Sequence, residues 1–386
     1  MSDRRDDRAR ASEEPERRET GAADRGDGAA DAHGDPAVGA ERARLSRRRL
    51  LRAGGLGGAA LLGGGVLGRA SAGGRSDADP LGVPTAGQAA LDEEPSELAE
   101  LGASDGYGRV APPSDLDREH LDALTLAPPR DDAPAGSLRE YDMSVTAERH
   151  EVADGVGIDA WAYGGRVPGP VLRATEGDVL RLRMRNYGPG AHSLHLHGNH
   201  PPGPMDGVEP IPEGETFTYE FPADPVGVHP YHCHVGPIDE HVRRGQYGVL
   251  IVDPPGGRPP AHEVVLVLGG FDVDGDGRDD LYAFNGLAGA YDRHPIRVPV
   301  GERVRCYVAN LVAGEAVAGF HLHARTFDVY RSGTALEPDE HTDTISLGMA
   351  ERAVLEFSLP EPGRYMFHPH QLRLASRGAM GWFAAV

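Results

Sequence analysis

The 386-residue sequence has two cysteines, no lysine and few aromatic side chains, which make up 6% of the chain. Two cysteines cannot build a disulfide framework, so the fold depends on its hydrophobic core. The formal net charge is −21, and all 39 basic residues are arginine. Such an acidic balance argues against nucleic acid and anionic membranes as partners.

The sequence also lacks an apolar run long enough to span a membrane. Residues 46–72 combine a basic start, a Gly/Ala/Leu run and the small-residue ending Ala70-Ser71-Ala72, which is typical of a signal peptide. The stretch "SRRRLLR" at 46–52 is similar to the twin-arginine export signal. We therefore predict a disordered n-region with a twin-arginine-type signal peptide over 1–72, and a periplasmic, cell-surface or extracellular protein.

Glycine and proline are abundant, at 53 and 32 residues, which favours many short strands joined by turns. Residues 73–136 are rich in Asp and Pro, and we expect them to form an arm or linker with one short helix near 116–126.

The remaining sequence repeats itself. "AYGGRVPGPVLRATEGDVLRLRMRN" (162–186) aligns with "AFNGLAGAYDRHPIRVPVGERVRCYVAN" (283–310), and each copy continues to two histidine pairs and a closing apolar strand. Apolar residues alternate with period two between turn residues, which indicates antiparallel strands. The sequence predicts an all-β chain of two tandem Greek-key β-sandwich domains, at 137–256 and 260–386.

Four H-x-H pairs occupy matching positions in the two copies. The side chains at i and i+2 of a strand point to the same face, so each pair can present two imidazoles to one metal. One such pair on a strand is usually a surface accident, whereas two per repeat in register indicate a metal site. The pairs are His195/His197, His232/His234, His321/His323 and His368/His370.

Cys233 lies between two of these histidines, so its side chain points to the opposite face of the strand and serves a different metal. Thiolate and imidazole select copper, zinc or iron over magnesium and calcium. His192, three residues before His195, and His241, eight after Cys233, are well placed to join the thiol. Two histidines and a cysteine with a weak axial ligand form the blue-copper electron-transfer site.

The stretches "HSLHLHG", "YHCHVGPIDEHVRRGQYG", "GFHLHA" and "FHPHQ" resemble those of multicopper oxidases, specifically the two-domain, laccase-like group. The resemblance covers about residues 140–386 and implies two cupredoxin-like domains. It also implies a type 1 copper that accepts electrons and a cluster of three coppers that reduces dioxygen to water. On this resemblance, His192, Cys233 and His241 bind the type 1 copper, His195 and His321 the type 2 copper, and His197, His232, His234, His323, His368 and His370 the type 3 pair.

The second copy departs from the repeat where type 1 ligands would stand, because it has Ala318, Pro369 and Leu374 there. We therefore expect a single type 1 copper, in the first domain. The axial position, five residues after His241, holds Gln246. Gln246 either donates its side-chain oxygen to copper or packs at the start of a strand, and a register shift would put Tyr247 there instead.

Proton delivery to the cluster requires a nearby carboxylate. Asp206 matches the acid that the family places near the type 2 copper, and Asp239 and Glu240 are rivals. The stretch "DVDGDGRDD" at 272–280 resembles the start of a calcium loop, but its twelfth position is Ala283 rather than Glu, so we interpret it as an acidic loop before a strand.

The sequence thus predicts a secreted enzyme that couples one-electron oxidation of a small reductant, such as a phenol, aromatic amine or metal ion, to reduction of dioxygen, with four coppers per chain. The resemblance implies a homotrimer without a membrane span after processing. Two alternatives stay open: a copper-containing nitrite reductase, and a non-catalytic copper or electron-carrier protein. Nitrite reductases resemble this chain but carry Asp at the position of His195 and lack the histidine at 234.

Overall fold

The computed structural model describes residues 110–386. The predicted signal segment 1–72 and the predicted arm up to residue 109 lie outside the described residues. Within the described part, β-strands predominate and no helix is long and apolar enough to cross a membrane. The all-β prediction is confirmed.

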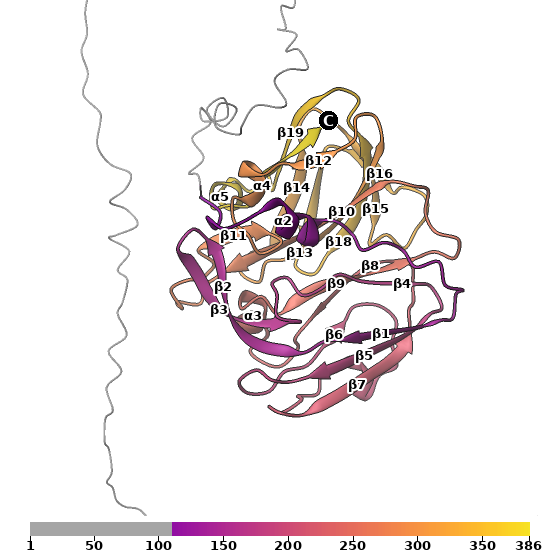
Figure 1. Ribbon diagram of the computed structural model, residues 1–386, viewed down its shortest axis with the longest axis vertical. Helices are drawn as coiled ribbons and strands as arrows, with labels where there is room; N and C mark the ends of the chain where they lie inside the picture. Colours follow the sequence, from indigo (N-terminus) through magenta and orange to yellow (C-terminus); the bar gives the residue numbers. More distant parts are fainter. Residues whose placement is uncertain (1–109) are drawn as a thin grey trace, which may run out of the picture. The chain divides into compact units, whose positions relative to one another are not determined.

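The first half, from β1 to β9 (residues 138–253), contains three sheets, coloured from purple through magenta to salmon in Figure 1. One has the order β1 (Leu138–Asp142), β5 (Val179–Arg185) and β7 (Thr216–Pro222), and a hairpin joins β2 (Val145–Ala153) to β3 (Val156–Tyr163). The third has the order β4 (Leu172–Thr175), β9 (Tyr247–Asp253), β8 (Gly227–His232) and β6 (His195–Leu196). The short helices η2 (Gly203–Asp206) and α3 (Ile238–Arg243) lie between strands.

The second half is a sandwich of two sheets. The six-stranded sheet has the order β11 (Leu281–Phe284), β10 (His262–Phe271), β13 (Arg303–Leu311), β18 (Arg352–Ser358), β15 (Phe327–Arg331) and β16 (Glu340–Thr342). The five-stranded sheet has the order β12 (Ile296–Val298), β20 (Gly381–Ala385), β19 (Gly363–His368), β14 (Val317–Leu322) and β17 (Thr344–Gly348). The short helices α4 (Ala290–Arg293) and α5 (Leu372–Ser376) complete this half.

The expectation of antiparallel strands is confirmed for most pairs, but each half also contains two parallel pairs. In the first half β1 pairs with β5 and β4 with β9, and in the second β10 pairs with β13 and β12 with β20. Alternation along a strand reports which face is buried, and it does not report the direction of the neighbouring strand. The parallel pairs fall at matching places in the two halves, as the sequence repeat requires.

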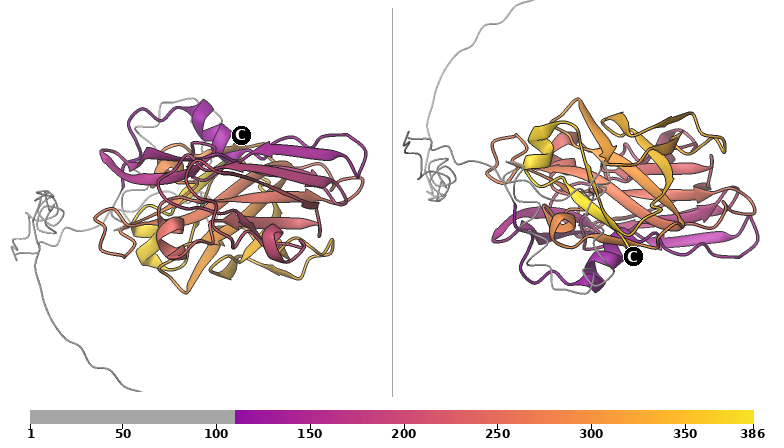
Figure 2. Two further views of the ribbon diagram at one scale, coloured as in Figure 1. Left: turned by 90° about the horizontal axis from the view of Figure 1, so that it is seen from below. Right: turned by 90° about the horizontal axis from the view of Figure 1, so that it is seen from above.

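The two halves share a hydrophobic core, and the strands there are buried on both faces. Strand β9 (YGVLIVD) is buried at every position. Strand β10 sends Val265 and Val267 into the shared core with Val249 and Ile251 of β9, and its alternate residues into the core of the second half. Strands covered on both faces become continuous apolar runs, which explains the closing strand of the first repeat. Figure 2 shows the strands stacked in layers.

Helix α2 (Arg118–Thr125) confirms the short helix expected in the arm. Asp117 caps its first turn by accepting from the His120 amide at 2.8 Å, and Leu121 and Leu124 pack into the core of the second half.

Candidate metal centre

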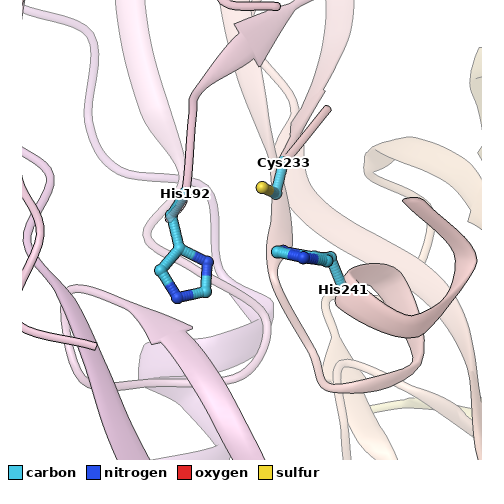
Figure 3. Close-up of side chains that lie close together, drawn as sticks. All are labelled: His192, Cys233 and His241. Atoms are coloured by element: carbon cyan, nitrogen blue, oxygen red, sulfur yellow. The ribbon is translucent and has the colours of Figure 1, made fainter. Parts of the chain in front are cut away.

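Three side chains from separate places in the first half converge in Figure 3. His192 is held in a bridge to Ile211, Cys233 follows the last residue of β8, and His241 lies on α3. All three are buried, and their ligand atoms lie within 4.8 Å of one another. This arrangement is the one that the sequence predicts for a type 1 copper site.

Burial keeps both imidazoles neutral, which a metal ligand requires. It lowers the pKa of His192 to about 4, and the nearby His241 adds to this shift. Burial also lowers the pKa of His241, against the opposing hydrogen bond to Gln246. It raises the pKa of the Cys233 thiol, while backbone amides of Ser193 and Val235 act in the other direction.

The side-chain oxygen of Gln246 contacts the imidazoles of both His192 and His241. Its fully buried side chain has Oε1 3.0 Å from His192 Nδ1 and 2.9 Å from His241 Nδ1. Its Nε2 atom is buried and has no hydrogen-bond partner. The oxygen therefore points to the place where the two imidazoles and the thiol converge, which fits the axial position expected from the sequence.

Tyr247 is not at this site. Its side chain is buried in the core shared by the two halves, and its hydroxyl occupies the space that a Cβ on Gly269 would need. The register shift that would make Tyr247 the axial residue is therefore excluded by the fold.

Two residues at this site were missed by the sequence analysis. The Ser193 amide donates to Cys233 Sγ at 3.3 Å, and the Ser193 hydroxyl accepts from the His234 amide at 3.0 Å. The indole of Trp161 packs edge-on against His192 and His241, with ring centroids 5.1 and 4.6 Å apart. Ser193 could have been found as the neighbour of a predicted ligand, whereas Trp161 lies on β3 with no signal in the sequence.

The first-half pairs form one group of four histidines. His195 of β6 stands directly opposite His232 of β8 in the sheet. The Nε2 atoms of His197 and His232 are 3.2 Å apart, and the ring centroids of His195 and His234 are 5.1 Å apart. Burial lowers the pKa of His197 to about 3 and that of His232 to about 4, so both are neutral at pH 7.

The second-half pairs repeat this arrangement. His321 of β14 stands opposite His368 of β19, as His195 stands opposite His232. The Nε2 atoms of His323 and His368 are 3.0 Å apart, and the ring centroids of His321 and His370 are 4.9 Å apart. The structure thus brings all eight predicted histidines into two matching groups of four.

Backbone carbonyls fix the orientation of corresponding rings in the two groups. The Nδ1 atoms of His195 and His321 lie 2.6 and 2.8 Å from the carbonyl oxygens of Asp206 and Asp343. The Nδ1 atoms of His232 and His368 lie 2.8 and 2.9 Å from the carbonyls of Cys233 and Pro369. A carbonyl accepts, so Nδ1 carries the proton and Nε2 keeps its lone pair for a metal.

The two groups of four remain separate within one chain. Across residues 110–386, no group of three or more metal-ligand atoms within 4.8 Å of one another combines histidines from both halves. Each group therefore provides half of the ligands expected for the cluster.

Of the three candidate carboxylates, only Asp206 lies beside the histidines. Its Oδ1 is 3.2 Å from His195 Nδ1 and 3.6 Å from Nε2 of His200, a residue that the sequence analysis did not assign. Asp239 and Glu240 lie on α3 and pair with arginines four residues ahead, Arg243 and Arg244. Although Asp239 and Glu240 are close to Cys233 in sequence, their carboxylates pair with arginines rather than with the paired histidines.

The second half has no donors at the position of the type 1 site. Ala318 and Leu374 are buried in the core of that half. The carbonyl of Pro369 accepts from His368, as the carbonyl of Cys233 accepts from His232. The repeated backbone has kept its geometry while the thiol and imidazoles have been replaced by apolar side chains.

Two β-sandwiches with one His₂Cys group and two groups of four histidines define a copper-binding redox protein. A family model described as multicopper oxidase matches residues 144–257, and a second model with the same description matches residues 258–386. The chain belongs to the multicopper oxidase family and is an oxidoreductase.

The similar proteins include both copper nitrite reductases and multicopper oxidases. The chain is 28% identical to the copper-containing nitrite reductase of Neisseria meningitidis over 289 residues, covering 68% of this chain and 74% of that protein. A solved multicopper oxidase is 39% identical, with a TM-score of 0.66, over 68% of this chain and 96% of that one. The copper nitrite reductase of Nitrosomonas europaea is 31% identical, with a TM-score of 0.59, over 64% of this chain and 94% of that one.

The residues present fit copper. Neutral imidazoles, a buried thiol and a buried carboxamide oxygen converge at the His192–Cys233–His241 site. Imidazole and thiolate are copper ligands, and the His₂Cys set with a weak axial oxygen is specific to blue copper.

Proposed function

We propose that the protein is a laccase-like oxidase that binds four coppers per chain: one type 1, one type 2 and two type 3. His192, Cys233 and His241 would hold the type 1 copper, and the Gln246 side-chain oxygen beside both imidazoles would be its fourth donor. Bound copper supplies the one-electron oxidation of a reducing substrate and the reduction of dioxygen to water.

The observation that carries this proposal is the matched pair of four-histidine groups. A type 1 site alone needs only one His₂Cys set, so an electron carrier leaves these eight histidines unexplained. His232 and His234 flank Cys233 in the chain and pack against His195, whereas Cys233 lies with His192 and His241. The backbone therefore provides a covalent path between the type 1 ligands and the histidine cluster.

The remaining groups orient these ligands and supply protons. Hydrogen bonds to backbone carbonyls present Nε2 of His195, His232, His321 and His368 to the metals. The Asp206 carboxylate lies 3.2 Å from His195 Nδ1 and would relay protons to the cluster.

We also propose that the active form is a homotrimer. Each chain provides two separate groups of four histidines, and a metal cluster that needs both must take the second group from another chain. The number three comes from the family resemblance, and cyclic association of three copies forms three equivalent junctions that leave no group unmatched. The sequence signal at 46–72 further supports export through the twin-arginine route.

A second candidate function, nitrite reduction, is favoured by the names of the relatives at 28% and 31% identity. Two residues argue against nitrite reduction. On the family resemblance, nitrite reductases have Asp at the position of His195 and no histidine at the position of His234. The rings of these two histidines lie 5.1 Å apart, within the first-half group. A three-copper cluster uses both of them.

The test is steady-state reduction of dioxygen and of nitrite by the copper-loaded protein, with phenolic, aromatic amine and metal-ion reductants. The laccase-like proposal requires oxygen uptake without nitrite turnover. Nitrite reduction in the absence of oxygen uptake would replace it by the second candidate. Reversible oxidation of the blue copper with turnover of neither acceptor would favour an electron carrier.

A further inference from the structure

The three type 1 ligands are not held in the same way. The amide and carbonyl of His192 bond to Ile211, and Cys233 directly follows β8, so both are fixed by strand pairing of the first half. His241 lies instead on α3, a helix of six residues whose N-cap residue, Pro237, provides no side-chain hydrogen bond. The position of His241 therefore depends on what holds α3.

One face of α3 rests on the second half. Val242 is fully buried in the core shared by the two halves, and Ile238 packs against the same core. The next polar residue, Arg243, crosses to the second half and donates from Nε to Asp279 Oδ1 at 2.9 Å. Arg243 also donates to Asp239 within the helix at 2.5 Å. The guanidinium thus joins the ligand-bearing helix to a carboxylate of the second half.

Asp279 belongs to the acidic stretch 272–280, to which the proposed function gives no role. Its side chain is fully buried, and Oδ2 accepts from the Gly314 amide at 3.1 Å. Burial raises the pKa of the Asp279 carboxyl, and Arg243 and the Gly314 amide oppose that shift.

Two glycines make the space that this carboxylate occupies. A Cβ built on Gly270 of β10 would lie 2.5 Å from Asp279 Oδ2, and one on Gly314 would lie 2.4 Å from the same atom. The carboxylate cannot move toward β10 or toward the turn after β13 that contains Gly314, so its position relative to both is fixed. A buried, sterically confined acid is a rigid anchor for the arginine that it holds.

We propose that Asp279 is a positioning residue for the type 1 copper, which acts through Arg243 to fix α3 and hold His241 against His192 and Cys233. This inference rests on the proposed function, because it assumes copper at that site. Residues that orient metal ligands from outside the coordination sphere typically contribute about 10- to 100-fold in metal affinity. The second half has no type 1 ligands of its own, but through Asp279 it would position the type 1 ligand His241 of the first half.

The experiment compares Asp279→Asn with Asp178→Asn. Asp178 is an equally buried carboxylate that accepts from Arg139 Nε at 2.7 Å and from backbone amides of Gly136, Ser137 and Thr175, with no bond to α3. Type 1 copper affinity is measured by competition with a copper chelator, following the blue absorption. The midpoint potential and the copper hyperfine splitting are measured on the same samples.

We expect Asp279→Asn to weaken type 1 copper binding by about tenfold or more and to change the hyperfine splitting. Asp178→Asn should lower thermal stability while leaving affinity, potential and splitting as in the wild type. Wild-type affinity and spectra in Asp279→Asn overturn the inference. So does an equal loss in Asp178→Asn, because general destabilisation would then explain both.

Gly314→Ala provides a second test that keeps the charge of Asp279. Gly314 does not have a left-handed backbone conformation, so a Cβ is allowed there and would displace the carboxylate. If Asp279→Asn does not fold, a weakened type 1 site in Gly314→Ala supports the inference and an unchanged site overturns it. A wild type that is not blue defeats the proposed function itself, whereas a blue wild type with unaffected variants defeats only this inference.

Discussion

Acidification of the copper-free protein tests the electrostatics of the type 1 site. His192 is fully buried, with a pKa of about 4 against an ordinary value of 6.5. The folded state therefore binds fewer protons than the unfolded state between these values. Its free energy of unfolding falls as the pH drops through 6.5 and levels off below the folded pKa.

For His192 alone this linkage amounts to about 2 kcal/mol lost between pH 7 and pH 5. The matched variant is His192→Gln, which removes the titrating group while keeping a polar side chain of similar size. Urea unfolding of both proteins at the two pH values, in the presence of a copper chelator, measures the difference. The wild type should lose about 2 kcal/mol more than the variant on acidification. Equal losses would show that His192 titrates normally and that its burial does not enforce the neutral form.

Three further changes test individual residues of the copper sites. Cys233→Ser should abolish the blue absorption while the histidine cluster still loads copper, and a variant that stays blue would contradict the assigned thiolate. Gln246→Leu should raise the potential of the blue copper, because an oxygen donor to the oxidised metal is lost, whereas Tyr247→Phe should leave the potential unchanged. A redox titration in which only Tyr247→Phe shifts the potential would refute the axial assignment. Asp206→Asn should slow dioxygen reduction about 10- to 100-fold at unchanged blue absorption, and the same loss in Glu240→Gln would show that proximity to His195 is not what matters.

The histidine groups could be predicted from the sequence because their signal is local. In an H-x-H pair the strand period alone puts both rings on one face, and it puts Cys233 on the other face from His232 and His234. The repeat put the pairs at matching positions of the two copies, and the structure then shows His195 opposite His232 and His321 opposite His368. Gln246 was found by its spacing from His241.

The contacts that shape the site could not be predicted because they join distant parts of the chain. Nothing near Trp161 in sequence indicates that its indole packs on His192 and His241. The bond from Arg243 to Asp279 spans 36 positions and crosses from one half to the other. Asp239 and Glu240 were considered because they follow Cys233, but helix α3 turns both toward arginines.

The measurement that tests the central claim most directly is the number of electrons consumed per acceptor, together with the copper content per chain. The account predicts four coppers per chain and four equivalents of a one-electron reductant oxidised for each dioxygen consumed. Two coppers per chain, with one equivalent of reductant consumed per nitrite and no oxygen uptake, would contradict it.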